Sequence, residues 1–586
     1  MNRALFSLLL SLALVLSARA ELIVRNPVAG FGGGFVPERF NLLSVEVVNT
    51  GAQPFEGVIS IDDGGFSGSP VKTSQMLFVS PGSSRWVQFY PYVTGYQRWQ
   101  ISWRDAQGRG DSMSVLRDED SVRTGAPVTV VFNAPDSPVT QQTRLRPFME
   151  NLFPPSVTGT TGLYAAVMDH VPRWDAPRRQ AFRDWVYRGG IVHLLQGVDG
   201  KFPEFDGELA PLNITGKSGT FGAGRIVRHE KSRQTIEAKD LGEEPKMLSD
   251  GTGHMTDVSG LLVNRLSDIT RPNIPWPFIY LLTVLYVVLI GPVFYFQRKR
   301  DYRVMLGAFV GTVALFAWLF TVVGRRGYGE QQVIHTVGYA ESLGGNRHLV
   351  TQWMHAFATS SGKYNFQYPA GGGHAYATLT SSGTVRADVV AGAEAALHAE
   401  IPLFSARPFV HGGTLTADDT SVEITAWEAP DRLEKFRIKP NANFPKNVKS
   451  MYAVHRRRVY DMTPNGNEWV AESGANSKDI DSFTDGQQFN YYGYYSFDGE
   501  HDPNAPKTVR LERRLSDLGT LFTGMLTGSK AHMRQRISTP DPGADTIRLF
   551  TYAQVSEAWP MPAANFQFGG GYILYSQTLQ NPAPSK

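Results

Sequence analysis

The sequence predicts a multidomain protein of α/β plus all-β class, with two transmembrane helices in mid-chain. The chain has 586 residues, which is enough for three or four domains. Glycine (58) and proline (36) are plentiful, a composition typical of short strands joined by many turns. Two apolar stretches, at residues 276–296 and 304–323, each have the length that a helix needs to cross a membrane.

The charge balance and the absence of cysteine narrow the function classes. Lys+Arg (57) nearly balances Asp+Glu (54), and the net charge of +3 lacks the basic footprint of a nucleic-acid-binding protein. The chain contains no cysteine, which excludes disulfides, thiolate metal sites and cysteine nucleophiles. The histidines show no zinc-type spacing. We therefore expect no cofactor, no metal and no nucleic-acid partner.

The first 20 residues have the pattern of a signal peptide. A positive start at Arg3 precedes a largely apolar run over residues 4–16, and Ala18-Arg19-Ala20 has the small-x-small pattern that signal peptidase accepts. We predict cleavage before Glu21, and the alternative is an uncleaved anchor. In either case the following domain leaves the cytoplasm.

The two apolar stretches predict a membrane hairpin. Spans at residues 275–296 and 304–323 flank a loop at 297–303 that holds four cations, as the positive-inside rule expects of a cytoplasmic turn. With the first domain exported, residues 324–586 return to the outer side. A hairpin buried inside a soluble domain is the competing interpretation.

Within the second span, Gly307 and Gly311 form a small-xxx-small surface on which another helix can pack closely. We expect the chain's own first span to pack there. The alternative is a second copy of the chain or a helix of a partner protein.

Each soluble portion has its own pattern. Residues 21–120 show short apolar alternations, such as Val45 with Val47 and Ile59 with Ile61, which predict an immunoglobulin-like β-sandwich. Residues 121–270 predict an α/β unit, with strands at 128–132 and 191–195 and a short helix at 258–266 before the membrane. Its clearest helix starts at the N-cap Asp175 and stops at Gly189-Gly190.

Residues 324–586 predict a β-rich region. We expect a hairpin with strands at 452–460 and 468–471 and a turn at 464–466. Residues 349–357 are assigned to a helix that packs on these strands.

Several short motifs suggest chemistry only weakly. The acidic residues Asp479, Asp481 and Asp485 lack the turn glycine and one ligand of a calcium loop, so we favour a solvated acidic loop. The basic run at 455–458 is compatible with phosphate or lipid headgroups, and alternation along a strand would divide it between two faces. The tyrosine-rich run at 491–495 is interpreted as a rigid loop or core rather than a sugar-binding surface.

Two segments carry a resemblance to a known family. They are Trp-Val-Tyr-Arg-Gly-Gly at 185–190, and Ile-Gly-Pro-Val-Phe-Tyr at 290–295 running into Arg-Lys-Arg-Asp at 298–301. With the order of parts, they resemble a family of uncharacterised bacterial inner-membrane proteins that have a signal peptide, a sandwich domain, a class I glutamine amidotransferase-like domain, a membrane hairpin and a β-rich tail. The resemblance implies a flavodoxin-like α/β fold and a place in the cell envelope. True amidotransferases use a cysteine nucleophile, so their activity does not carry over.

Two functional hypotheses follow. The first is a non-catalytic inner-membrane component that presents its periplasmic domains to a protein or cell-wall partner. The second is an envelope hydrolase whose site is assembled only in the fold, which a cleft with convergent carboxylates or a Ser–His pair would favour. We expect the first. A transporter fits less well, because neither span contains an ionisable residue of the kind that marks a pathway.

Overall fold

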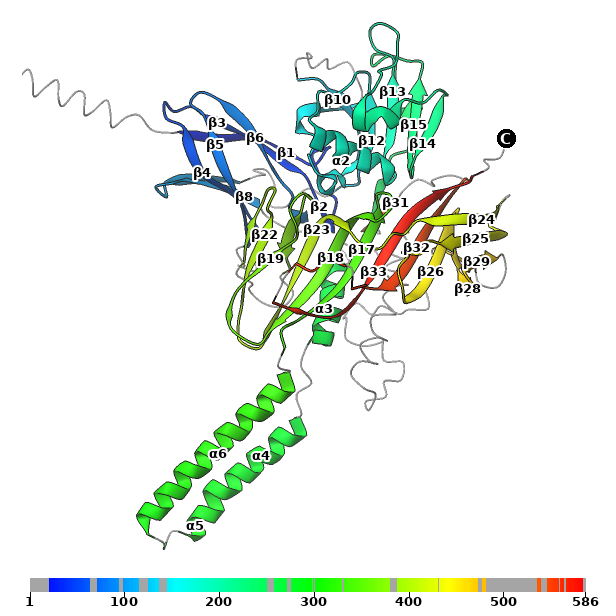
Figure 1. The fold of residues 1–586 in the computed structure, drawn as a ribbon. Coiled ribbons are helices and arrows are strands. Elements are labelled where there is room, and N and C mark those ends of the chain that lie inside the picture. The colour runs from blue at the N-terminus through cyan, green and yellow to red at the C-terminus, as the bar shows by residue number, and fades with distance from the viewer. Residues whose placement is uncertain are drawn as a thin grey trace, which may run out of the picture.

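The computed structural model confirms a β-rich, multidomain chain with two long apolar helices. It describes residues 21–582 except 64–70, 94–98, 115–124, 136–144, 250–257, 271–275, 298, 300, 329–330, 380–386, 430–431, 473–476, 481–534, 539–544, 558 and 563–564. The helical hairpin projects from one end of a large body, and an α/β unit lies at the opposite end (Figure 1).

The N-terminal part consists of two facing sheets. One contains β1 (Leu22–Ala29), β3 (Leu43–Asn49) and β6 (Ser84–Phe89). The other includes β4 (Phe55–Asp63), β5 (Val71–Val79), β8 (Trp99–Asp105) and β9 (Gly110–Ser114), while β2 (Arg39–Phe40) pairs with β7 (Tyr92–Val93). The alternation seen in the sequence has the expected result, because Val45, Val47, Ile59 and Ile61 are all buried in the shared core.

The second N-terminal sheet is extended by strands that come after the helical hairpin in the sequence. Strand β5 pairs in parallel with β21 (Ala387–Val390), with Ala387 opposite Val71 and Val390 opposite Ser74. Beyond β21 lie β22 (Ala396–Ile401) and β19 (Gly362–Gln367), which complete a seven-stranded sheet. The predicted divisions at residues 120 and 324 therefore do not separate independent sheets.

The α/β unit is a mostly parallel sheet in the order β11-β10-β12-β13-β15-β14. Its strands are β10 (Val128–Asn133), β11 (Arg146–Met149), β12 (Leu163–Met168), β13 (Ile191–Leu195), β14 (Ser218–Phe221) and β15 (Gly224–His229). Short 3-10 helices η1 (Glu150–Leu152), η2 (Val157–Thr160) and η3 (Gly207–Leu212) lie between them, and η4 (Ala238–Leu241) follows β15.

The predicted helix of this unit is α2 (Ala176–Tyr187). The Asp175 side chain accepts a hydrogen bond from the Arg178 amide, as an N-cap should. Trp185 is fully buried, and its ring lies 2.6 Å from where a Cβ of Gly190 would stand. Gly190 is thus required for close packing, while Gly189, with φ 128°, makes the turn that follows the helix.

A nine-stranded sheet forms the centre of the body. Its order is β20 (Ala375–Thr378), β23 (Ser405–Thr416), β18 (Arg347–Ala358), β17 (Val333–Ser342), β33 (Gln567–Gln580), β32 (Thr546–Gln554), β26 (Val448–His455), β27 (Arg458–Asp461) and β30 (Ser477–Asp479). A small sheet of β24 (Val422–Glu428), β25 (Lys435–Pro440), β29 (Glu468–Glu472) and β28 (Thr463–Asn465) accompanies it.

Helix α3 (Val258–Thr270) belongs with this central sheet rather than with the α/β unit to which we assigned it. It contacts β17, β18 and β23 and buries Leu262, Val263 and Leu266. Nearby, β16 (Lys246–Ser249) pairs with β31 (Gln535–Ser538). Segments that precede the hairpin in the sequence and segments that follow it therefore share one core.

Two predictions for the region after the hairpin are wrong. Residues 349–357 form part of β18 instead of a helix, and nearly all of this strand is buried because strands cover it on both edges and other elements pack on both faces. Such a strand lacks the alternation that marks a half-exposed one. The predicted strand at 452–460 is itself a hairpin, because Arg456 and Arg457 have positive φ (43° and 61°) and turn the chain between β26 and β27. The predicted turn at 464–466 and return strand at 468–471 are present, but they belong to a second hairpin of β28 and β29.

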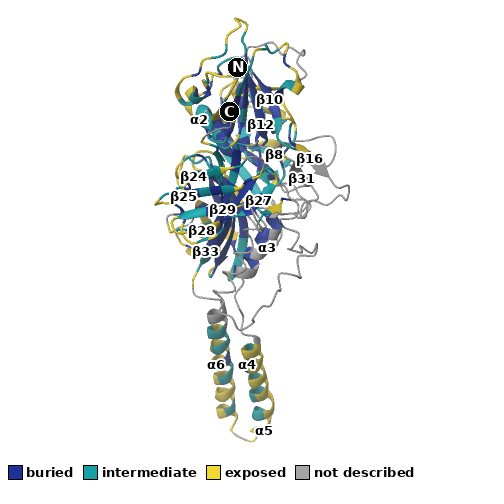
Figure 2. Ribbon diagram, turned by 90° about the vertical axis from the view of Figure 1, so that its right-hand side faces the viewer, coloured by how far each residue is buried: buried dark blue, intermediate teal, exposed yellow. Residues whose placement is uncertain are grey.

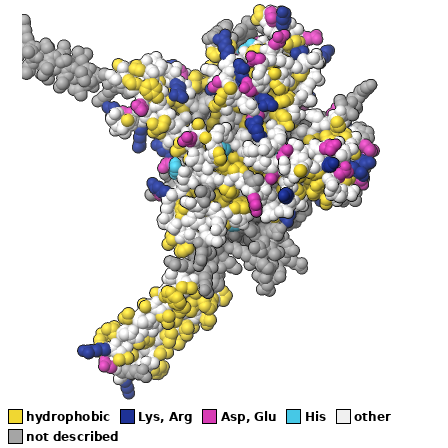
Figure 3. Space-filling view, in the orientation of Figure 1, with side chains coloured by type: hydrophobic (Ala, Val, Ile, Leu, Met, Phe, Trp, Pro, Cys, Tyr) yellow, Lys and Arg dark blue, Asp and Glu magenta, His cyan; other side chains and the backbone are white. Residues whose placement is uncertain are grey.

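The two apolar helices have the length and composition of membrane spans. They cover Pro277–Phe296 and Tyr302–Val323, with a mean hydropathy of 2.2 each, and only 6% of each is buried within the body. The first consists of α4 (Trp276–Val288), a π-helical turn at Leu289–Val293 and α5 (Phe294–Phe296), and the second is α6 (Tyr302–Tyr328). Figure 2 shows their largely exposed surface, and Figure 3 shows apolar side chains along the hairpin with basic ones at its tip.

The two helices of the hairpin meet through aromatic rings. Tyr286 packs on Phe316 with ring centroids 5.1 Å apart, and Phe294 packs on Phe309 at 5.9 Å. Gly307 and Gly311 lie elsewhere on α6, and a Cβ built on either would meet no atom within 4 Å. The structure thus does not place the first span against the glycine surface.

Candidate functional site

Two places in the body have the geometry of a candidate site, and the first is the carboxyl edge of the parallel sheet. In open parallel sheets, ligands bind outside the carboxyl ends of the strands, at the point where the strand order reverses. Here that point lies between β10, which ends at Asn133, and β12, which is followed by Asp169 and His170.

The guanidinium of Arg233 occupies this point. Its Nε and Nη2 donate to the two carboxylate oxygens of Asp169 at 2.9 and 2.7 Å. Its Nη1 donates to the Asn133 side-chain oxygen at 2.5 Å, and Nη2 also donates to the Phe132 carbonyl at 2.7 Å. A bidentate pair of this kind is among the strongest polar contacts in proteins. A side chain of the protein itself therefore occupies the topological switch point, the place where the strand order reverses.

Beside this arginine, His170 lies between two carboxylates. Its Nδ1 is 2.8 Å from Asp169 Oδ1 and its Nε2 is 2.8 Å from Glu150 Oε2. The hydrogen bonds to Asp169 and Glu150 raise the pKa of His170 to about 9. Burial raises the pKa of Asp169, but the hydrogen bonds from His170 and Arg233 outweigh that effect and lower it. At neutral pH the ring is an imidazolium with both N–H groups engaged, so it has no lone pair with which to act as a base.

The five side chains of this site, those of Asn133, Glu150, Asp169, His170 and Arg233, were not singled out from the sequence. Glu150 and Asp169 each follow a strand directly, which is the one signal that pointed to this edge. Arg233 is 100 residues from its partner Asn133 in the sequence, and no local sequence pattern predicts that contact.

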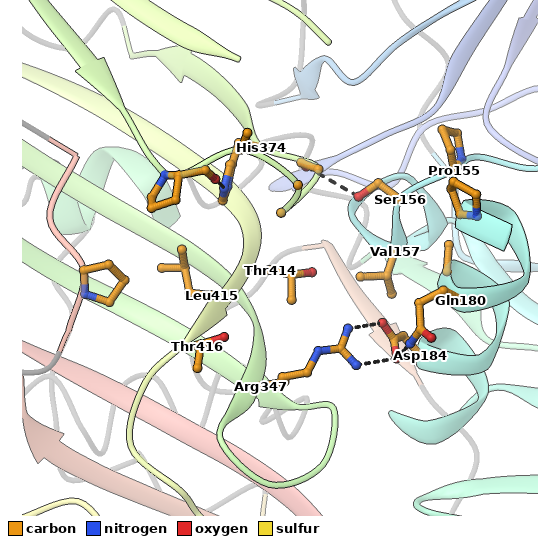
Figure 4. Close-up of a pocket in the computed structure, with 18 residues that line it drawn as sticks. Pro155, Ser156, Val157, Gln180, Asp184, Arg347, His374, Thr414, Leu415 and Thr416 are labelled. Atoms are coloured by element: carbon orange, nitrogen blue, oxygen red, sulfur yellow. Dashed lines mark hydrogen bonds and ion pairs between the residues drawn. The ribbon is translucent and has the colours of Figure 1, made fainter. Parts of the chain in front are cut away.

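The second candidate is a cleft of about 620 Å³ between the α/β unit and the central sheet. One wall is formed by the start of η2 and by the side of α2 that carries Gln180 and the buried Asp184. The other is formed by β23 and by the loop before β20, which includes His374 (Figure 4). Clefts of this volume with a few convergent polar groups are the usual places for ligands.

The cleft is bridged by an ion pair and is neutral overall. Arg347 donates to both oxygens of Asp184, at 3.2 and 2.6 Å, and Gln180 donates to the same carboxylate at 2.7 Å. The His374 Nδ1 lies 3.0 Å from His411 Nε2, and burial lowers the pKa of both rings. Both histidines are therefore neutral at pH 7.

No Ser–His pair forms in the described part of this cleft. The Ser156 hydroxyl donates to the Thr158 hydroxyl at 3.1 Å, and His374 Nε2 is engaged by the Pro369 carbonyl at 3.0 Å. The polar groups there suit binding by hydrogen bonds better than nucleophilic attack.

The residues singled out from the sequence lie elsewhere. Gly307 and Gly311 are exposed on α6, and the basic run at 455–458 contains the turn between β26 and β27. Asp479 ends β30, whereas Asp481, Asp485 and the aromatic run at 491–495 lie outside the described residues. Among the residues that are described, no three histidine, aspartate or glutamate side chains are grouped so as to hold a metal ion.

Comparison with known proteins adds little. No family model matches the chain, and no curated protein matches it. One similar solved structure is a cycloisomaltooligosaccharide glucanotransferase of Paenibacillus sp. complexed with cycloisomaltoheptaose. The match covers 78% of this chain and 98% of that chain at 8% sequence identity, with a TM-score of 0.15. At that score the likeness carries no argument about fold or function.

Proposed function

We propose that this chain is a non-catalytic component of a bacterial cell envelope. A hairpin in the inner membrane would hold its soluble body on the periplasmic side, where it presents binding surfaces to a protein or cell-wall partner. The observation that carries the proposal is Arg233, which fills the switch point of the α/β sheet with contacts to Asp169 and Asn133. This guanidinium stands where such folds hold a substrate, and its donors are already used by groups of the chain itself.

The proposal also extends to the fold of the α/β unit, which we take to be amidotransferase-like. The parallel order β11-β10-β12-β13-β15 is that of flavodoxin-like sheets and supports this view. The chain has no cysteine to supply the nucleophile of that family. The unit would therefore keep the fold for binding alone.

Segments before and after the apolar hairpin pack together in one body, which supports a topology with both segments on the same side of a membrane. The Ser259 hydroxyl on α3 contacts the Tyr92 hydroxyl at 2.8 Å and accepts from Trp353 Nε1 at 3.0 Å, which joins chain from both sides of the hairpin. Strands β5 and β21 join them again. If the two apolar helices cross a membrane, both soluble segments must lie on the same side of it.

Topology can be tested with single cysteines, because the chain has none of its own. Gln107 and Ser361 are exposed on the two soluble segments, and Gln297 is exposed at the hairpin tip. In cells with a permeabilised outer membrane, an impermeant maleimide should label Gln107→Cys and Ser361→Cys, and should label Gln297→Cys only after lysis. Labelling of Gln297→Cys in intact cells, with protection of the other two, would reverse the orientation.

One observation favours an envelope hydrolase as the second candidate. The carboxylates of Glu150 and Asp169 converge on His170, and convergent carboxylates can serve as the general acid and base of a hydrolase. We expect the purified full chain to release no ammonia from glutamine and no fragments from cell-wall peptidoglycan. Turnover that is present in the wild type and in His398→Gln, an exposed histidine, but absent in His170→Gln would establish the hydrolase instead.

A further inference from the structure

A second, smaller cavity lies where three parts of the body meet. Its volume is about 60 Å³, which is roughly the volume that two water molecules take up in liquid water. Arg39 lines it from the N-terminal sheets, Thr161 and Arg188 from the α/β unit, and Tyr339 and Glu341 from β17. It is separate from both candidate sites described above.

The single carboxylate that lines this cavity is already satisfied. Arg188 Nη1 donates to Glu341 Oε2 at 2.8 Å, and the Tyr339 hydroxyl donates to Oε1 at 3.1 Å. The remaining Nη2 of Arg188 donates to Thr160, at 3.3 Å to both its carbonyl and its hydroxyl. One arginine and one tyrosine therefore account for both oxygens of Glu341.

Two further guanidiniums act on the same place without a carboxylate of their own. Arg39 donates to the Glu38 carbonyl at 3.1 Å, and Arg548 on β32 lies over the ring of Phe550 with its guanidinium 5.2 Å from the centroid. Among the described residues neither makes an ion pair. Burial raises the pKa of Glu341, but the charges of Arg188, Arg39 and Arg548 outweigh that and lower it.

Arg188 also retains an unused donor. Its Nε is buried without a hydrogen-bond acceptor among the described residues. A buried donor without a partner costs about 1–3 kcal/mol, so such a group usually marks a missing partner. The cavity thus combines surplus positive charge with an unsatisfied N–H.

We propose that this junction cavity binds a phosphate-type oxyanion, held by Arg39 and Arg188, the two guanidinium groups that line it. Guanidinium groups are the preferred partners of phosphate, because their planar N–H donors match its oxygens in pairs. The cavity has room for a phosphate group and for little else, so any larger ligand must extend out through its mouth. The inference does not depend on whether the chain has an enzymatic activity.

Isothermal titration of the full chain in detergent with sodium phosphate tests the proposal, with sodium chloride at matched ionic strength as the salt control. Arg39→Gln should weaken phosphate binding about tenfold or more, because it removes a charged hydrogen-bonding group from the cavity wall. Arg548→Gln should weaken binding by a smaller factor, because it removes only a positive charge that acts on Glu341 from β32. Arg85→Gln is the matched control, since Arg85 is exposed on β6 and the same charge is lost there. It should leave the affinity unchanged.

The source of the phosphate is distinguished by a second ligand. If glycerol phosphate binds as tightly as inorganic phosphate, the cavity takes the phosphate of a larger molecule such as a lipid or wall polymer, whereas binding of inorganic phosphate alone indicates the free ion. Absence of saturable binding, or equal losses in all three variants, overturns the proposal. Circular dichroism identifies any variant that fails to fold, and the half-buried Arg548 then provides the test independently of Arg39.

Discussion

The α/β unit and helix α3 pack on the same central sheet by different means. Helix α3 buries Leu262, Val263 and Leu266 in an apolar core. The α/β unit shares the buried leucines Leu343 and Leu349 with this part of the chain. It adds two ion pairs, Asp184 with Arg347 and Arg188 with Glu341, and leaves two cavities beside them. An apolar contact of this depth behaves as part of one domain, whereas a polar contact with cavities is typical of modules that bind or move.

The largest expected effect lies at the apolar contact. Leu262→Ala should lower the free energy of unfolding by about 2–5 kcal/mol, because a fully buried leucine is truncated and leaves a cavity. Chemical denaturation of the full chain in detergent measures it. Met76→Ala, at a methionine whose side chain is 75% exposed, is the control and should change little. If the two variants lose the same stability, α3 is not part of a shared core.

The next largest expected effect is a pH dependence of the free energy of unfolding, which comes from His170 in the α/β unit. The pKa of His170 is raised to about 9 in the folded state, so its contribution is fully present below its unfolded pKa of about 6.5 and is lost as the pH rises through 9. The wild type should lose on the order of 3 kcal/mol of stability over that interval. His170→Gln should remove this loss, and His398→Gln should retain it. Denaturation midpoints at pH 6, 7.5 and 9 provide the comparison, and equal slopes in all three proteins would contradict it.

How much of this comparison could be predicted from the sequence depends on the range of the contacts involved. Helix α2 was predicted from Asp175 and the Gly189-Gly190 stop, because capping is decided within a few residues. Strand β18 was taken for a helix, because a strand covered on both faces loses the alternation that identifies it.

The contacts that make the candidate sites are all long-range. The pairing of β5 with β21 and the reach of Arg233 to Asn133 join segments that no local pattern connects. Glu341 lies on a strand whose sequence shows nothing of the three arginines that surround it in the fold. Sequence therefore predicted helix α2 and the two long apolar helices, while the sites follow only from how the segments meet.

The ion pair between Asp184 and Arg347 should contribute less to stability than Leu262 or His170 does. Arg347→Met removes the partner of Asp184, whose side chain is 6% exposed, while the arginine side chain itself is 37% exposed. We expect a loss of about 1–2 kcal/mol, since a half-exposed pair is worth less than a buried one. Hydrogen exchange should show faster exchange in α2 and η2 with little change in α3. Equal acceleration in α3 would mean that both contacts belong to one cooperative unit.

The smallest effect on the folded chain is expected in the membrane, at Gly307 and Gly311. Neither position meets another atom where a Cβ would stand, so Gly311→Leu should leave thermal stability in detergent almost unchanged, whereas packing on the first span would make the loss about 1 kcal/mol. The alternative partner is a second copy or another protein's helix. In that case Gly307→Leu and Gly311→Leu should abolish cross-linking between chains or to the partner in membranes, while Leu306→Val, at an exposed position on another side of α6, should preserve it. If stability and cross-linking are unaltered in both glycine variants, this face of α6 contacts only lipid. The hairpin is then an anchor alone, and the contacts that matter for assembly lie in the soluble body.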